Sequence, residues 1–209
     1  MKKSAFFAAL VLVLMALSPL SAATLYETGD GDSAWGGDVQ VGISNISAPP
    51  WAPNGTTSAG AIWVNKVDSG FQGGGPALGV LTIYTLTLLD VVSFHARALA
   101  DDGSLIEKSV DGGAFSTLVN SSGAPQGVNC SSLVPSCPAT MVWDSGMVAV
   151  NGGLGGDVIL RFTTSQDVGG TPMGLQASVM AESVPEPSTL ALMTVGAFLV
   201  GLGWIKKRV

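Results

Sequence analysis

The 209-residue sequence has few of the side chains on which most catalytic and metal sites depend. It contains one histidine, His95, and two cysteines, Cys130 and Cys137. This rules out Cys-x-x-Cys redox or metal motifs and the paired histidines of zinc hydrolases. It also lacks a Gly-x-Ser-x-Gly elbow, a phosphate-binding loop and a Gly-x-Gly-x-x-Gly turn. His95 lies in the polar phase of an alternating stretch, with no nucleophile motif nearby. We therefore expect a surface or sheet-edge histidine, no catalytic residues and no enzyme activity.

Charged residues are also scarce, at 11% of the chain, and basic ones are the scarcest. Two apolar ends raise the mean hydropathy to +0.46. Without them, residues 24–184 hold four basic and fourteen acidic residues, a net charge of −10. Such an acidic domain will not bind nucleic acid by counterion release, and it suits an exported protein that stays soluble near anionic surfaces. The domain is long enough to bury a hydrophobic core of its own.

The N-terminal segment has the three parts of a secretory signal peptide. Met1-Lys2-Lys3 is basic, Ala5–Leu17 is apolar, and Ser21-Ala22-Ala23 offers small residues to signal peptidase. Ser18-Pro19 breaks a helix just before the small residues, which disfavours the alternative of an uncleaved anchor. We expect cleavage after Ala22 or Ala23 and assign residues 1–23 to the signal peptide.

The C-terminal segment combines an extended triplet, an apolar run and a basic end. Val184-Pro185-Glu186-Pro187 precedes the run Leu190–Ile205, and Lys206-Lys207-Arg208 follows it. The two prolines keep the triplet extended. With two more residues at its start, the run reaches roughly 27 Å as a helix, just short of a bilayer core of about 30 Å. The basic cluster stays on the cytoplasmic side. An ordinary single-pass anchor would share these features, except the triplet.

This order of features resembles the PEP-CTERM sorting signal of exported proteins of Gram-negative bacteria. The resemblance assigns residues 184–209 to a sorting signal with a transmembrane helix. It implies an exosortase, a membrane-embedded protease, as the processing partner. The protein would then be exported, anchored transiently in the inner membrane, and delivered to the cell surface or the extracellular matrix.

Residues 24–183 show the period-two alternation of half-buried β-strands and almost no helical periodicity. About ten short strands separated by Gly, Asp, Asn and Pro clusters predict an antiparallel β-sandwich. The expected strands are Val39–Ile46, Ala61–Val67, Leu81–Leu89, Val92–Leu99, Ser104–Val110, Ala114–Val119, Thr140–Trp143, Met147–Val150, Val158–Thr163 and Leu175–Glu182.

Two short segments resemble parts of jelly-roll ectodomains. Ala100-Asp101-Asp102-Gly103 lies between two of the expected strands, and Asp111-Gly112 follows where Asn-Gly is usual. Asp-Gly also favours a type I′ hairpin turn. Thr171–Leu175 resembles the start of the last strand in many PEP-CTERM ectodomains. The resemblance implies a jelly-roll, galactose-binding-like fold.

Cys130 and Cys137 are expected to form a disulfide, since an exported chain meets an oxidising compartment. They close a small Pro-containing loop. A redox or metal role would need Cys-x-x-Cys or further ligands. We therefore favour a structural staple.

Sugar and calcium binding are the two ligand hypotheses for the domain. Trp35 and Trp51 lie in Gly/Pro-rich segments, where an aromatic ring can serve as a sugar platform or can plug the end of the sandwich. Trp63 and Trp143 lie in expected strands and are assigned to the core. The pairs in Asp30-Gly31-Asp32 and Asp101-Asp102 offer oxygen ligands for a structural calcium, but Asp and Gly also simply make turns. We favour turns and assign no metal residues.

The sequence thus predicts a non-enzymatic, exosortase-processed protein associated with exopolysaccharide or biofilm. A specific carbohydrate-binding module is the alternative. A secreted hydrolase is a third reading, because the many acids could pair in a cleft.

Overall fold

The computed structural model describes residues 22–43, 55–66, 81–101, 103–118, 142–165, 174–184 and Gly196. Within these ranges the chain forms ten β-strands and one 3-10 turn, η2 (Asn151–Gly153), and every strand pairing is antiparallel. The strands are β1 (Ala23–Glu27), β2 (Trp35–Gly37), β3 (Val41–Gly42), β4 (Val64–Asn65), β5 (Leu81–Asp101), β6 (Gly103–Val110), β7 (Ser116–Thr117), β8 (Trp143–Ala149), β9 (Gly156–Ser165) and β10 (Gly174–Ser183).

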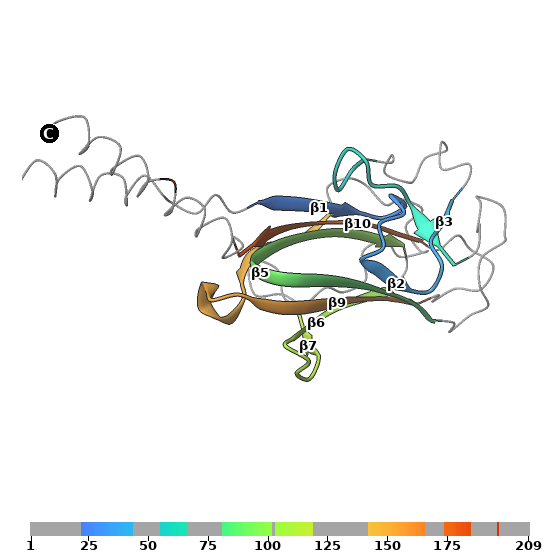
Figure 1. Ribbon diagram of the computed structural model, residues 1–209. Coiled ribbons are helices and arrows are strands. Elements are labelled where there is room, and N and C mark those ends of the chain that lie inside the picture. The colour runs from blue at the N-terminus through green and yellow to red at the C-terminus, as the bar shows by residue number, and fades with distance from the viewer. Residues whose placement is uncertain are drawn as a thin grey trace, which may run out of the picture. The chain divides into compact units, whose positions relative to one another are not determined.

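Strand β5 is 21 residues long and folds back on itself halfway (Figure 1). At the bend its register with β9 shifts, and Asp90 has a φ of 51°. Ser165 of β9 lies opposite both Leu81, the first residue of β5, and Gly103, just beyond its last. The start of β5 and the start of β6 therefore flank the same residue of β9.

We call residues 81–88 of β5 the first arm and residues 91–101 the second arm. The first arm pairs with β2 and β9, and β9 continues to β6 and β7. The second arm pairs with β8 and β10, and β10 also pairs with β1 and, near its start, with β4. One hydrogen-bonded sheet thus forms two layers joined at the bend of β5 (Figure 1). The predicted all-β antiparallel class is confirmed, while the finer jelly-roll assignment stays a prediction.

The two arms fill one core with residues of different size. Alternate residues of a strand point to the same face, so each arm turns every second side chain inward. The first arm contributes large side chains, and the second contributes mainly alanine. The fully buried members are Tyr84, Leu86 and Leu88 on the first arm, Phe94, Ala96, Ala98 and Ala100 on the second, Val158, Leu160 and Phe162 on β9, and Leu175, Ala177, Val179 and Ala181 on β10. The predicted core tryptophans, Trp63 and Trp143, are also buried.

The period-two pattern located most of these strands. The expected strands at 81–89 and 92–99 are the two arms, and those at 104–110, 158–163 and 175–182 lie within β6, β9 and β10. The two strands expected at 140–143 and 147–150 are one strand, β8, which passes a bulge in its pairing with β5. Strands β1 and β2 were not predicted.

The two turn motifs behave differently. Asp111 and Gly112 have positive φ angles of 50° and 71°, and Gly113 N donates to Val110 O at 2.9 Å. They form the expected type I′ turn, which joins the paired strands β6 and β7. The connection from Asp101 to Gly103, by contrast, joins strands of different layers, because β6 pairs with β9 and β7.

Residues 23–183 form one compact unit, the β-domain. Among the described residues, no helix has the length and apolar character to cross a membrane. Three predicted features lie outside the described ranges: the signal peptide up to residue 21, most of the transmembrane helix, and the disulfide between the two cysteines. They stay predictions.

Candidate functional site

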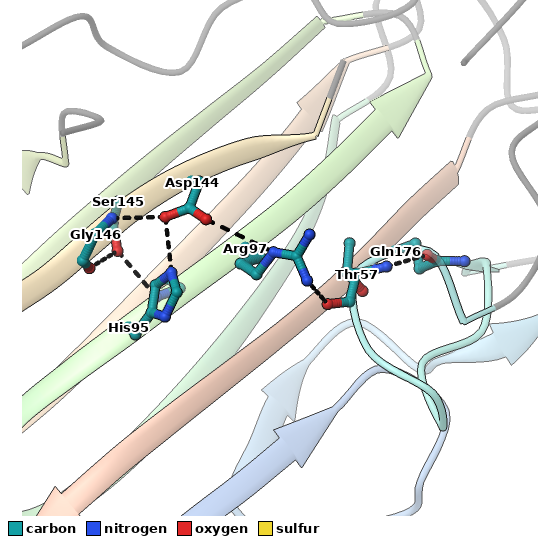
Figure 2. Close-up of polar contacts among 8 residues, drawn as sticks. Thr57, His95, Arg97, Asp144, Ser145, Gly146 and Gln176 are labelled. Atoms are coloured by element: carbon teal, nitrogen blue, oxygen red, sulfur yellow. Dashed lines mark hydrogen bonds and ion pairs between the residues drawn. The ribbon is translucent and has the colours of Figure 1, made fainter. Parts of the chain in front are cut away.

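The outer face of the second arm carries a polar cluster centred on Asp144. His95 and Arg97 alternate with the buried alanines of β5, so both side chains point away from the core. Asp144 lies opposite Arg97 on β8. His95 Nε2 lies 2.7 Å from Asp144 Oδ1, and Arg97 Nε lies 3.7 Å from Asp144 Oδ2 (Figure 2).

Asp144 is held as a carboxylate by its neighbours. Burial works to raise the pKa of Asp144, but the Gly146 N–H, the His95 ring and the Arg97 guanidinium together lower it below its usual range. The Gly146 N–H donates to Asp144 Oδ1 at 2.7 Å. Because a carboxylate only accepts hydrogen bonds, His95 donates to it through Nε2.

The rest of the cluster fastens a neighbouring segment to the sheet. Arg97 Nη1 donates to Thr57 O at 2.5 Å, and Thr57 N donates to Gln176 Oε1 at 2.9 Å (Figure 2). Both contacts hold residues 55–60 against β5 and β10.

The hydroxyls near His95 are already engaged. Ser145 Oγ accepts from Ala96 N at 2.9 Å and donates to Gly146 O at 2.6 Å. Ser93 Oγ donates to Glu182 Oε2 at 2.7 Å. In the described part of the chain, His95 has no hydrogen-bonded nucleophile. The expected position of His95, in the polar phase of a strand, is confirmed.

A second feature is a surface hollow beside β2, which we call the Trp35 hollow. It has a volume of about 350 Å³ and is lined by Gly29, Gly31, Asp32, Trp35, Gly36, Gly37, Asp38, Val39 and Gln40. Four of the nine are glycines, Gly29, Gly31, Gly36 and Gly37, which expose the backbone at the surface of the hollow. Gly37, with a φ of 86°, has no room for a Cβ, which would lie 2.4 Å from Ile83 O.

Trp35 is half-buried and does not stand free as a platform. It lies opposite Leu86 of the first arm, and its ring packs at 5.7 Å from that of Phe162, tilted by 44°. Part of the ring therefore belongs to the core, as expected for a side chain that plugs the sandwich. The remainder lines the hollow.

Two residues that line the hollow, Trp35 and Gln40, each carry a nitrogen donor with no hydrogen-bond partner in the described part of the chain. Trp35 Nε1 and Gln40 Nε2 are both removed from solvent and unsatisfied. Gln40 is fixed in place because its Oε1 accepts from Gly29 N at 2.7 Å. Buried donors without partners are uncommon, and a ligand that supplies acceptors is one explanation for them.

Acidic groups complete the surroundings of the hollow. Asp38 Oδ2 accepts from Ile83 N at 2.8 Å, which ties it to the first arm. Burial, and then the nearby Asp38 carboxylate, raise the pKa of Tyr84 well above its usual range, so its hydroxyl stays protonated. That hydroxyl is buried and has no hydrogen-bond partner among the described residues. Asp32 also lines the hollow.

The aspartates proposed for calcium are used by the turn itself. Asp30 accepts from the backbone N–H groups of Glu27 and Asp32 at 2.9 and 2.8 Å, and Asp32 accepts from Ala34 N at 2.8 Å. Among the described side chains, no group of three or more His, Cys, Asp or Glu could hold a metal ion. The side chains of Asp101 and Asp102 lie outside that set. Asp30-Gly31-Asp32 thus has the geometry of the favoured turn.

The structure reaches only some of the predicted site residues. Val184, the first residue of the sorting signal, is exposed, one residue beyond the end of β10. The triplet Pro185-Glu186-Pro187, the basic tail, Trp51 and the cysteines lie outside the described residues. Gln40 and Asp38 were missed, because nothing in their sequence marks them and only the pairing of β2 with β5 brings them to Trp35.

A comparison with protein families matches residues 183–208 to the PEP-CTERM protein-sorting motif. This confirms the predicted resemblance at the C-terminus. The chain therefore carries the sorting motif of exported, exosortase-processed proteins. A comparison with curated proteins gave no match.

Several solved structures are similar in part. A family 35 carbohydrate binding module from Clostridium thermocellum is 13% identical, with a TM-score of 0.35, over 76% of this chain and 98% of that one. An exo-β-1,3-galactanase from Phanerochaete chrysosporium is 16% identical, with a TM-score of 0.33, over 77% of this chain. The chain spans 29% of the galactanase. At these TM-scores neither likeness carries an argument about function.

Proposed function

Since the chain carries a PEP-CTERM sorting motif, we propose that it is a non-enzymatic, exosortase-processed protein of the cell surface or extracellular matrix, associated with exopolysaccharide. The observation that carries the proposal is the match at residues 183–208. It begins at the last residue of β10, so the motif follows the β-domain without a spacer. A signal peptide at the other end and an acidic domain between them support the same route.

Processing is tested by expressing the protein with and without exosortase and measuring the mass of its C-terminal peptide. We expect loss of the basic tail only in the strain with exosortase. Replacing Pro185-Glu186-Pro187 with three alanines should abolish that loss. Replacing Lys206-Lys207-Arg208 with alanines leaves the triplet intact. This variant tests whether exosortase still recognises the triplet when the basic residues that orient the membrane segment are missing. An identical, full-length C-terminus in both strains would disprove the proposal.

The second candidate function is specific binding of a neutral saccharide in the Trp35 hollow. The observation that favours it is the pair of unsatisfied donors, Trp35 Nε1 and Gln40 Nε2, beside the Asp32 and Asp38 carboxylates. Sugar hydroxyls both accept and donate, so one ligand can satisfy both kinds of group. A partly apolar ring beside such polar groups is typical of small-molecule sites. A jelly-roll, galactose-binding-like topology is part of this second proposal.

This candidate is tested with the host's exopolysaccharide and a glycan array. Trp35→Phe keeps the ring on Phe162 and removes only the N–H donor. Gln40→Glu keeps the oxygen that accepts from Gly29 N and removes the amide donor. Each loses one hydrogen bond, so we expect binding weaker by about three- to tenfold. Leu154→Ala, which is highly exposed and outside the lining, is the control and should bind like the parent. If Trp51→Ala abolishes binding while the other variants leave it unchanged, the glycan site lies elsewhere.

A further inference from the structure

The only histidine of the chain lies between two exposed methionines. His95 on β5 is directly opposite Met180 on β10 and Met147 on β8. Exposed fractions of 37% for Met180 and 54% for Met147 are high for such an apolar residue, and the His95 side chain is 28% exposed. We call these three residues the Met–His–Met row.

All three side chains point to the same side of the sheet. The neighbours of Met180 along β10, Val179 and Ala181, are in the core, so Met180 points outward. Met147 alternates with Val148, which packs against the core. Directly opposite residues in an antiparallel pair have Cβ atoms about 5 Å apart. Each methionine sulfur lies two bonds beyond its Cβ, so either can reach an ion held on the His95 ring.

Asp144 fixes which nitrogen of His95 is free. The hydrogen bond from Nε2 to the Asp144 carboxylate places the proton of the neutral ring on Nε2 and leaves the lone pair on Nδ1. The same arrangement, a carboxylate behind a histidine, orients histidine ligands in metal sites. Arg97 and the Gly146 N–H hold Asp144 in turn.

We propose that His95 Nδ1, together with the sulfurs of Met180 and Met147, forms an exposed binding site for a soft monovalent metal ion, Cu⁺. Thioether and imidazole ligands without thiolate favour Cu⁺ among the biological metals. Zinc takes thiolate, imidazole and carboxylate ligands instead, and calcium takes oxygen. The site is distinct from the Trp35 hollow and does not depend on the sorting function.

The test uses the full-length protein in detergent, with Cys130→Ser and Cys137→Ser so that no thiol competes for the metal. Anaerobic Cu⁺ titration against a chromophoric chelator gives the affinity. We expect at least about tenfold weaker binding for each ligand removed, in His95→Gln, Met180→Leu and Met147→Leu. Both leucine variants keep the apolar surface. Leu25→Ala is the matched control and should bind like the parent. Leu25 of β1 lies directly opposite Met180 and is not one of the three proposed ligands.

A second measurement keeps the proposal testable if a variant is poorly folded. With ¹³C-methyl methionine and Ag⁺ as a non-oxidising probe, only two of the seven methionine signals, those of Met147 and Met180, should shift. Zn²⁺ should shift neither. Asp144→Asn should weaken Cu⁺ binding by about tenfold through loss of ring orientation. Unchanged affinity in His95→Gln, or shifts confined to other methionines, would overturn the proposal.

Discussion

The two arms of β5 belong to one strand and one core, yet they use their faces in opposite ways. The first arm turns large side chains inward, and its outer face carries mainly threonine and aliphatic residues. The second arm turns mainly alanine inward, and its outer face carries His95 and Arg97. The first arm therefore supplies core volume. The second arm supplies small core residues on one face and the polar residues of the Asp144 cluster on the other.

The difference shows that burial and function are divided along the strand. Alanine occupies three inward positions of the second arm, and Ala98 lies opposite another buried alanine, Ala177 of β10. The register of this arm with β8 and β10 sets the cross-strand positions of Asp144, Met147 and Met180. Four predictions test this division, beginning with the largest expected effect.

Truncation in the first arm should be the most damaging change. Leu86 is fully buried, so Leu86→Ala should lower the free energy of unfolding by about 2–5 kcal/mol, through lost burial and the cavity left behind. Urea unfolding followed by tryptophan fluorescence measures this. Thr87→Ala, the exposed neighbour, is the control and should change little. Equal effects of the two substitutions would contradict the assigned faces.

Enlargement in the second arm should be the next most damaging. Ala98 lies opposite Ala177 on β10 and Trp143 on β8, all in the core. Ala98→Leu should therefore cost about 1–3 kcal/mol by overpacking, in the same assay. A stabilised Ala98→Leu protein would show that the layers leave room for a larger side chain there.

The bend between the arms should respond to backbone conformation. Asp90 has a φ of 51°, which a β-branched residue tolerates poorly and glycine adopts freely. We expect Asp90→Val to be less stable than Asp90→Gly by about 1–2 kcal/mol. Both variants keep the backbone N–H that donates to Asp157 Oδ1 at 3.0 Å. Similar stabilities would mean that the bend is not set by this residue.

The smallest effect concerns the acid dependence of contacts beside the bend. The hydrogen bond from Asn151, and then the Asp157 N–H, lower the pKa of Asp111 below its usual range. Because the pKa of Asp111 is lowered in the folded state, its ionised carboxylate contributes to stability above the ordinary carboxyl pKa. That contribution is lost as the pH falls through the pKa of Asp111 in the folded protein. NMR titration should show the depressed pKa of Asp111, and Asn151→Ala should raise it. An Asp111 that titrates normally in the parent protein would contradict the contact.

Much of the fold follows from local pattern, because period-two alternation reports which residues are buried. It identified both arms, β6, β9 and β10. It did not find β2, Trp-Gly-Gly, whose extended state comes from pairing with the first arm and not from its own residues. Nor did it find β1, which begins at the end of the predicted signal peptide and, in the described part of the chain, pairs only with a strand more than 150 residues away in sequence.

The sites were less predictable than the fold. Trp35 was identified from its type and its glycine-rich surroundings. Its partners Asp38 and Gln40 depend on how the chain curves after β2, which no short motif encodes. For His95, the alternating pattern predicted an outward side chain, but its contact with Asp144 and its position between two methionines depend on the register of β5 with β8 and β10. Register between strands far apart in sequence is set by the whole sheet.

The pairing of β1 with β10 has a consequence for the order of events during export. The mature protein is expected to begin at Ala23 or Thr24, which lie opposite Glu182 and Ala181, just before the sorting motif. β10 is also the strand that pairs with the second arm and with β4. On the proposed export route, with the N-terminus leading, β1 would cross the membrane first and would wait unpaired for β10. The sheet would then be completed only when the proposed C-terminal anchor reaches the membrane, so folding and anchoring would coincide.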